Sequence, residues 1–174
     1  MTQKAIGPSF YDELAAYGIA NNIVIIGTHF SWDSLGDLFF CSDTPAAVVT
    51  AVEAVYAAHN PSVIPPQMQA ATAFAAGLTV SSTGTPAING TYALDAATQF
   101  EINSVQLFVQ VNGDFPGGTG TYPWFDTSGA AHIFPGIAVF KDWATAIANY
   151  VAALKLYAAG APGASFPAAA ATIA

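Results

Sequence analysis

His132 and Asp126 are the pair of residues in this sequence that comes closest to a catalytic motif. Together with one of the serines they could form a Ser-His-Asp triad, in which the histidine takes the proton of the nucleophile. However, the sequence contains no nucleophile elbow of the form GxSxG. Combinations of three such residues also arise by chance in a chain of this size. We therefore expect no catalytic residue and no enzymatic activity.

The sequence also gives little support to a metal site or a pair of catalytic carboxylates. No two histidines have the i, i+4 spacing of a helical metal motif; they are His29, His59 and His132. The single Cys41 excludes a cysteine-rich zinc site and an intramolecular disulfide, and we expect it to be at least half buried. The turn aspartates Asp33, Asp37 and Asp126 are explained by the preference of Asp for turns. We expect neither a metal nor a cofactor.

The amino-acid composition limits the classes of molecule that the chain is expected to bind. The chain has 174 residues, of which 53% are hydrophobic and 8% charged, with Lys+Arg 3 and a net charge of −8. Binding to nucleic acid or to an anionic membrane needs clustered cations, so both are disfavoured. No apolar run reaches the roughly 18 residues of a transmembrane helix. A surface this poor in charge suits burial against other protein subunits.

Three segments have the pattern of a β-hairpin followed by a helix, and they begin near residues 30, 78 and 122. Each has two short apolar strands around a turn rich in Gly, Asp, Ser or Asn. Each is followed by an apolar stripe at helical spacing. In the second segment, Asp95 is the expected N-cap, Ile102, Val105, Phe108 and Val109 form the stripe, and Gly113 ends the helix.

The remaining elements complete a prediction of an α+β fold. We expect an N-terminal helix over 9–17, a strand over 23–26 and a short helix over 67–76. The predicted organisation is a hairpin-helix region over 1–62, a domain with two hairpin-helix units over 63–157, and an arm over 158–174. This arm consists mostly of Ala, Gly and Pro and cannot build a core of its own.

Several stretches resemble a domain of unknown function found in tailed-bacteriophage and prophage genes, often near tail genes. The resemblance covers residues 79–154 and is carried by STGTPAINGTY (82–92), VNGDFPGG (111–118), PWFDTSGAAH (123–132) and the helix over 140–154. Residues 30–61 are similar to segments that precede this domain. The resemblance implies a non-enzymatic structural component of the virion, in the tail, a fibre or a decorating layer.

The partners implied are other virion proteins and copies of the chain itself. Met1–Lys4 is not followed by the apolar segment of a signal peptide, so we expect synthesis in the host cytoplasm and localisation in the virion. Trp32, Trp124 and Phe166 are the predicted interface anchors, with Phe166 docking the arm on a partner. A tail-fibre assembly chaperone and a receptor- or carbohydrate-binding module, using Trp32 with Asp33 or Trp124 with Asp126, remain as alternatives.

Overall fold

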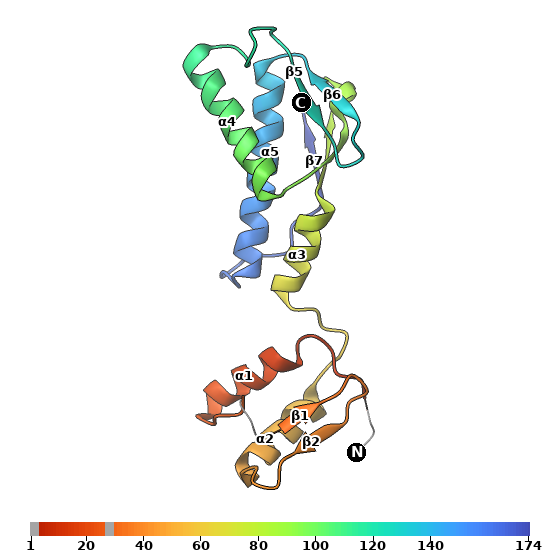
Figure 1. Cartoon of the computed structure of the whole chain (residues 1–174), viewed down its shortest axis with the longest axis vertical. Coiled ribbons are helices and arrows are strands. Elements are labelled where there is room, and N and C mark those ends of the chain that lie inside the picture. Colours follow the sequence, from red (N-terminus) through yellow and green to blue (C-terminus); the bar gives the residue numbers. More distant parts are fainter. Residues whose placement is uncertain (1–3, 27–29) are drawn as a thin grey trace. The chain divides into compact units, whose positions relative to one another are not determined.

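The computed structural model describes residues 4–26 and 30–174, and it is an α+β protein (Figure 1). The chain forms two compact units, with unit 1 over residues 1–65 and unit 2 over residues 66–174. The predicted boundary after residue 62 lies three residues earlier. The predicted arm over 158–174 is part of unit 2, because its last strand pairs within that unit.

Unit 1 is one hairpin packed with two helices. Its elements are α1 (Phe10–Asn21), β1 (Phe30–Trp32), β2 (Leu38–Phe40) and α2 (Ala46–Ala58). The predicted hairpin is confirmed, with Phe30 opposite Phe40 and Trp32 opposite Leu38. The apolar stripe of α2 packs on α1, and the core includes Phe10 and Val52, both fully buried.

Two expectations for unit 1 are wrong. Residues 23–26 form no strand; Ile25 instead packs its side chain into the core from an irregular segment. An apolar run of four residues fits such a segment as well as a strand, since burial alone produces it. Cys41 is exposed rather than half buried.

Unit 2 contains the second and third hairpin-helix units. Its elements are α3 (Pro66–Ala76), β3 (Leu78–Ser82), the 3-10 turn η1 (Pro86–Ile88), β4 (Gly90–Tyr92), α4 (Ala96–Asn112), β5 (Tyr122–Phe125), β6 (Ala131–Phe134), α5 (Ile137–Ala158) and β7 (Ala170–Ile173). Asp95 caps α4 as predicted, with its carboxylate accepting a hydrogen bond from the Thr98 amide. Gly113 ends α4 in the left-handed region at φ 72°.

The hairpins do not merge into one sheet. In unit 2, β5 and β6 pair only with each other, whereas β3 is the centre of a three-stranded sheet in the order β4-β3-β7. Strand β4 is antiparallel to β3, with Leu78 opposite Tyr92. Strand β7 is parallel to β3, with Thr79 opposite Ala170. The C-terminal segment is therefore held by strand addition within its own chain.

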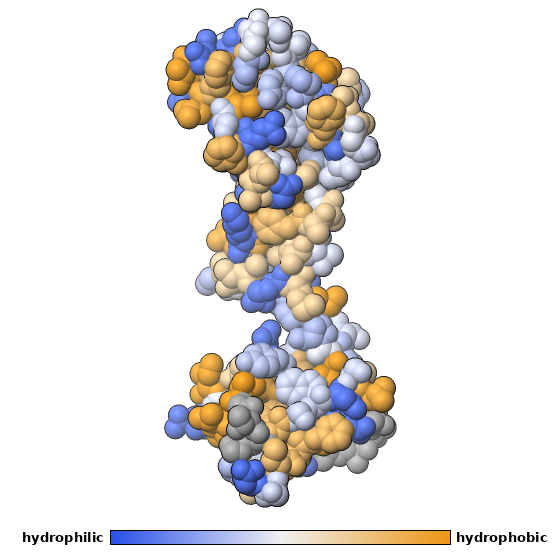
Figure 2. All heavy atoms as spheres, in the orientation of Figure 1, coloured by the Kyte–Doolittle hydropathy of each residue, from blue (hydrophilic) through white to orange (hydrophobic). Residues whose placement is uncertain are grey.

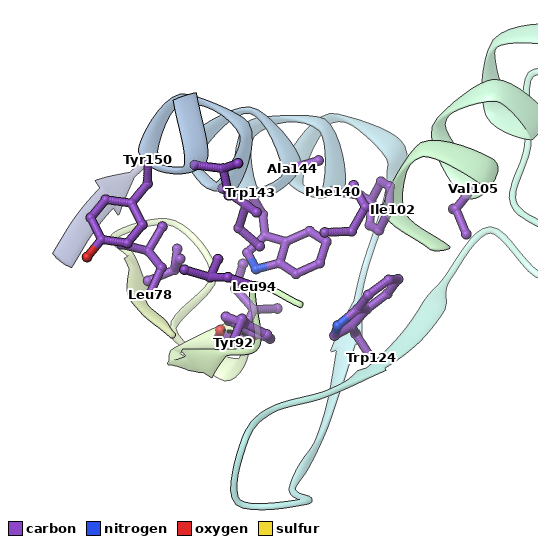
Figure 3. Packing of buried hydrophobic residues seen from close by; sticks show 14 of the residues in the cluster. Leu78, Tyr92, Leu94, Ile102, Val105, Trp124, Phe140, Trp143, Ala144 and Tyr150 are labelled. Carbon is purple, nitrogen blue, oxygen red and sulfur yellow. Dashed lines mark hydrogen bonds between the residues drawn. The ribbon is translucent and has the colours of Figure 1, made fainter. Parts of the chain in front are cut away.

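The core of unit 2 is built around α5 (Figure 3). Its predicted stripe is buried throughout: Phe140, Trp143, Ala144, Ile147, Val151 and Leu154. The Trp143 ring lies 5.0 Å from the Tyr92 ring and 4.9 Å from the Trp124 ring, so it joins β4 and β5 to the helix. Aromatic contacts of this kind stabilise a fold by more than the burial of their apolar area alone.

Candidate functional site

Asp126 and His132, the two residues that suggested a triad, lie close together in unit 2. Asp126 follows β5 and His132 belongs to β6, so the hairpin turn places them side by side. His132 Nε2 lies 3.2 Å from Asp126 Oδ2, and His132 Nδ1 lies 2.9 Å from the carbonyl oxygen of Ala87. The side chains are 11% and 12% exposed respectively, so water reaches this pair only at its edge.

The other oxygen of Asp126 organises the turn. Asp126 Oδ1 accepts hydrogen bonds from the Ser128 amide, the Ala130 amide and the Ser128 hydroxyl, the last at 2.6 Å. The hydrogen bond from the Ser128 hydroxyl, followed by that from His132, holds the pKa of Asp126 well below its usual range. Asp126 is therefore a carboxylate that is fully used as an acceptor.

This arrangement is not that of a catalytic triad. In a triad the serine hydroxyl bonds the histidine, whose free nitrogen takes the proton. Here the Ser128 hydroxyl bonds Asp126, and both nitrogens of His132 face acceptors. Neither nitrogen of His132 is therefore placed to take a proton from the Ser128 hydroxyl.

The pair instead fastens the β5–β6 hairpin to β4 and η1. His132 reaches the Ala87 carbonyl of η1, and the Thr127 amide donates to the Thr91 carbonyl of β4 at 2.8 Å. Gly90 permits this close approach, because a Cβ there would lie 2.9 Å from His132 Nε2. We call Asp126, His132 and Gly90 the clasp.

His59 has a comparable structural role in unit 1. Its side chain is completely buried, with Nδ1 2.9 Å from Glu13 Oε2 and Nε2 accepting a 2.9 Å hydrogen bond from the Gly7 amide. Because Nε2 accepts from the Gly7 amide, Nδ1 is the nitrogen that can donate to Glu13. His59 lies at the end of α2, as its C-cap residue. His29 lies outside the described residues.

The three predicted interface anchors have different environments. Trp124 is 6% exposed in the core of unit 2, so a partner could contact little of it. Trp32 is half buried and packs edge-on against Phe10. Phe166 is 43% exposed, and its ring lies 5.3 Å from that of Tyr157 in the same chain. Of the three, Phe166 offers the most surface.

The structure does not favour the carbohydrate platform. Asp33 Oδ1 accepts hydrogen bonds from three amides of its own turn, those of Leu35, Gly36 and Asp37. Asp126 is occupied in the clasp. Trp124 is buried and Trp32 is half buried, so neither presents the exposed ring face that a sugar-binding platform would need.

A surface that the predictions missed lies on α4. Its buried stripe faces α5, but four large apolar side chains face away from the core: Phe100 (74% exposed), Leu107 (61%), Phe108 (40%) and Val111 (73%). We call these four residues the outer stripe, and apolar side chains do reach the surface over α4 (Figure 2). The prediction had assigned Phe108 to the buried stripe. The signal was present in the i, i+7, i+11 spacing of Phe100, Leu107 and Val111.

A shallow groove of about 250 Å³ runs beside this surface, between α4 and α5. Its polar lining residues are Gln99, Asn103, Gln106 and Lys155, and the rest of the lining is Ile, Val and Ala. It has no carboxylate, histidine or thiol that could perform acid–base or nucleophilic chemistry.

Residues 4–26 and 30–174 contain neither a candidate metal site nor a candidate membrane span. No group of three or more His, Cys, Asp or Glu side chains in these ranges could hold a metal ion. No helix described there is long and apolar enough to cross a bilayer. No protein-family model, curated protein or solved structure matches the chain.

Proposed function

We propose that this chain is a non-enzymatic structural component of a bacteriophage virion, which acts by assembling with other virion proteins and with copies of itself. The observation that carries the assembly part is the outer stripe of α4. The virion part rests on the sequence resemblance of residues 79–154.

Several features of the surface support assembly. Exposed apolar side chains occur in both units, among them Ile19 (84% exposed) and Val24 (83%) in unit 1. In unit 2, Phe125 (64%) and Ile133 (51%) lie on the outward face of the β5–β6 hairpin. Apolar side chains gathered on one helix face, as in the outer stripe, are typical of protein-binding sites. Asp126, His132 and His59, which come closest to catalytic groups in the described residues, form hydrogen bonds that hold the fold together.

Mass spectrometry of purified particles tests this proposal, with the copy number of the chain measured per particle. The particles come from a phage that encodes the chain, and the lysate is measured in parallel. A fixed copy number in purified particles is the expected result. Absence from particles, with the protein abundant in the lysate, would overturn the proposal and favour the chaperone alternative.

A further inference from the structure

We propose that the outer stripe of α4 binds the outer stripe of a second copy of this chain, with the two helices antiparallel. This inference rests on the proposed function, because it names copies of the chain as one of the assembly partners. It concerns only α4, which lies wholly within unit 2.

The order of side-chain sizes along the exposed face of α4 favours antiparallel packing. Large side chains at Phe100 and Leu107 alternate with the smaller Ser104 and Val111, all of which are exposed. In antiparallel packing centred between residues 105 and 106, Phe100 of one copy meets Val111 of the other, and Ser104 meets Leu107. Each large side chain thus faces a smaller one, as interdigitating helices require.

The position of the charged residue on α4 also favours the antiparallel arrangement. Glu101 is the single charged residue on α4, and it lies near the first turn. In parallel, in-register packing the two Glu101 residues would lie at the same level along the helix axis. In the antiparallel arrangement they are nine residues apart along the axis, about 13 Å at 1.5 Å per residue. That separation exceeds the Debye length of about 8 Å at physiological ionic strength, so their repulsion is largely screened.

The near absence of charge on α4 favours a second copy of the chain over a charged partner. A cationic partner would find one carboxylate on this helix, and an anionic partner would find no cation. The exposed flanks carry the amides of Asn103, Gln110 and Asn112, which both donate and accept hydrogen bonds. Amide side chains of one copy can therefore form hydrogen bonds with the same side chains of another copy. A second copy thus matches both the apolar outer stripe and the polar residues beside it.

The area of the outer stripe determines how strongly two copies are expected to bind each other. An aromatic side chain covers about 150–250 Å², so the exposed parts of the outer stripe amount to roughly 400 Å² per copy and about 800 Å² for two. This is less than the roughly 1,200–2,000 Å² of stable specific interfaces and falls in the range of weak and transient ones. We therefore expect a dimer with a dissociation constant in the micromolar range. In a particle, the high local concentration would favour the same contact.

Sedimentation velocity of the full chain, over a range on the order of 5–500 µM, measures this association. Leu107→Glu places a charge at the centre of the stripe and should weaken the dimer at least about tenfold, since an unpaired charge would be buried. Gln106→Glu is the matched control: it adds the same charge one residue away, toward the groove with α5, and should leave the dimer intact. Circular dichroism confirms that both variants fold.

Cross-linking tests the orientation. In a Cys41→Ser background, Ser104→Cys should cross-link between copies with a short bifunctional maleimide, because the two positions lie three residues apart along the axis. Val111→Cys should not cross-link in the antiparallel arrangement, since its copies lie eleven residues apart, about 16 Å. Efficient cross-linking at position 111 would overturn the antiparallel arrangement.

A chain that stays monomeric at every concentration, or equal effects of Leu107→Glu and Gln106→Glu, would overturn the self-association itself. This outcome is distinguishable from failure of the proposed function. A monomer that is nevertheless found in virions contradicts only the α4 contact. A dimer that is absent from particles contradicts the virion assignment and leaves the α4 contact standing.

Discussion

Replacing Gly90 by Ala tests whether the clasp is as tightly packed as the structure shows. The added Cβ would lie 2.9 Å from His132 Nε2 and 3.3 Å from Asp126 Oδ2. The first distance is about 0.6 Å inside the optimum near 3.5 Å for nonbonded heavy atoms. The ring cannot retreat without stretching its hydrogen bonds to Ala87 and Asp126.

Two effects of opposite sign decide the magnitude. Overpacking a site that cannot relax typically costs about 1–3 kcal/mol. Replacing Gly by Ala also lowers the conformational entropy of the unfolded chain, which stabilises the fold by about 0.4–1 kcal/mol. The overpacking term is the larger, so we expect Gly90→Ala to lower the free energy of unfolding of unit 2 by about 0.5–2 kcal/mol.

Urea unfolding followed by tryptophan fluorescence is the assay. In a Trp32→Phe background the remaining tryptophans, Trp124 and Trp143, both belong to the core of unit 2 and report on that unit. With an m-value near 2 kcal/mol/M, the expected loss lowers the midpoint by about 0.25–1 M urea. Gly136→Ala is the matched control for steric overlap, because no described atom other than those of its chain neighbours lies within 4 Å of its Cβ position. Gly136 is the N-cap of α5, so its substitution should cost up to about 1 kcal/mol, and this cost should not change when His132 is removed.

A double-mutant cycle with His132→Ala isolates the cause. If the clash with the imidazole dominates, Gly90→Ala becomes nearly neutral or stabilising once His132 is removed. Equal destabilisation by Gly90→Ala in both backgrounds would refute the reasoning. The cost would then arise elsewhere along β4.

Three further predictions concern unit 2. Tyr150→Phe should be neutral or stabilise the unit by up to about 1 kcal/mol in the same urea assay, because the Tyr150 hydroxyl is buried with no hydrogen-bond partner in the part of the chain that the structure describes. Ile173→Asp should detach β7 and speed hydrogen exchange at the amides of Thr79 and Thr83, which donate to carbonyls of the β7 segment. Lowering the pH from about 5 to about 2 should destabilise the unit, since the pKa of Asp126 is lowered in the fold and the unfolded state, near 3.9, binds the proton first. Asp126→Asn should flatten that pH dependence, and an unchanged slope would contradict the assignment.

Local sequence signals were sufficient for most of the secondary structure. The β1–β2 hairpin and the β5–β6 hairpin follow from short apolar strands around turns rich in Asp, Ser and Gly. The ends of α4 follow from Asp95 and Gly113, whose side-chain oxygen and missing Cβ suit a helix start and stop. In these cases the determinants lie within a few residues of the element that they define.

Contacts between distant parts of the chain were not predictable in the same way. Strand β7 has the sequence Ala-Ala-Thr-Ile, which has weak β propensity and no turn signal. It becomes a strand because β3 offers an edge and because Ala171 and Ile173 reach the core of unit 2. The clasp likewise needs Ala87 and Gly90 to approach His132 from another hairpin. Tertiary structure decides both, and no spacing in the sequence encodes them.

The two long helices of unit 2, α4 and α5, differ in how many charged residues they carry, and this difference bears on function. Helix α5 carries exposed Lys141, Asp142 and Lys155 opposite its buried stripe, as a helix in contact with water commonly does, although it also exposes Leu156. Helix α4, with 17 residues, carries one charge and the outer stripe. Both helices pack in the same unit, so low charge across the whole chain does not explain the contrast. A requirement for apolar contact on α4 would explain it, and the α4–α4 contact that we propose would supply that requirement.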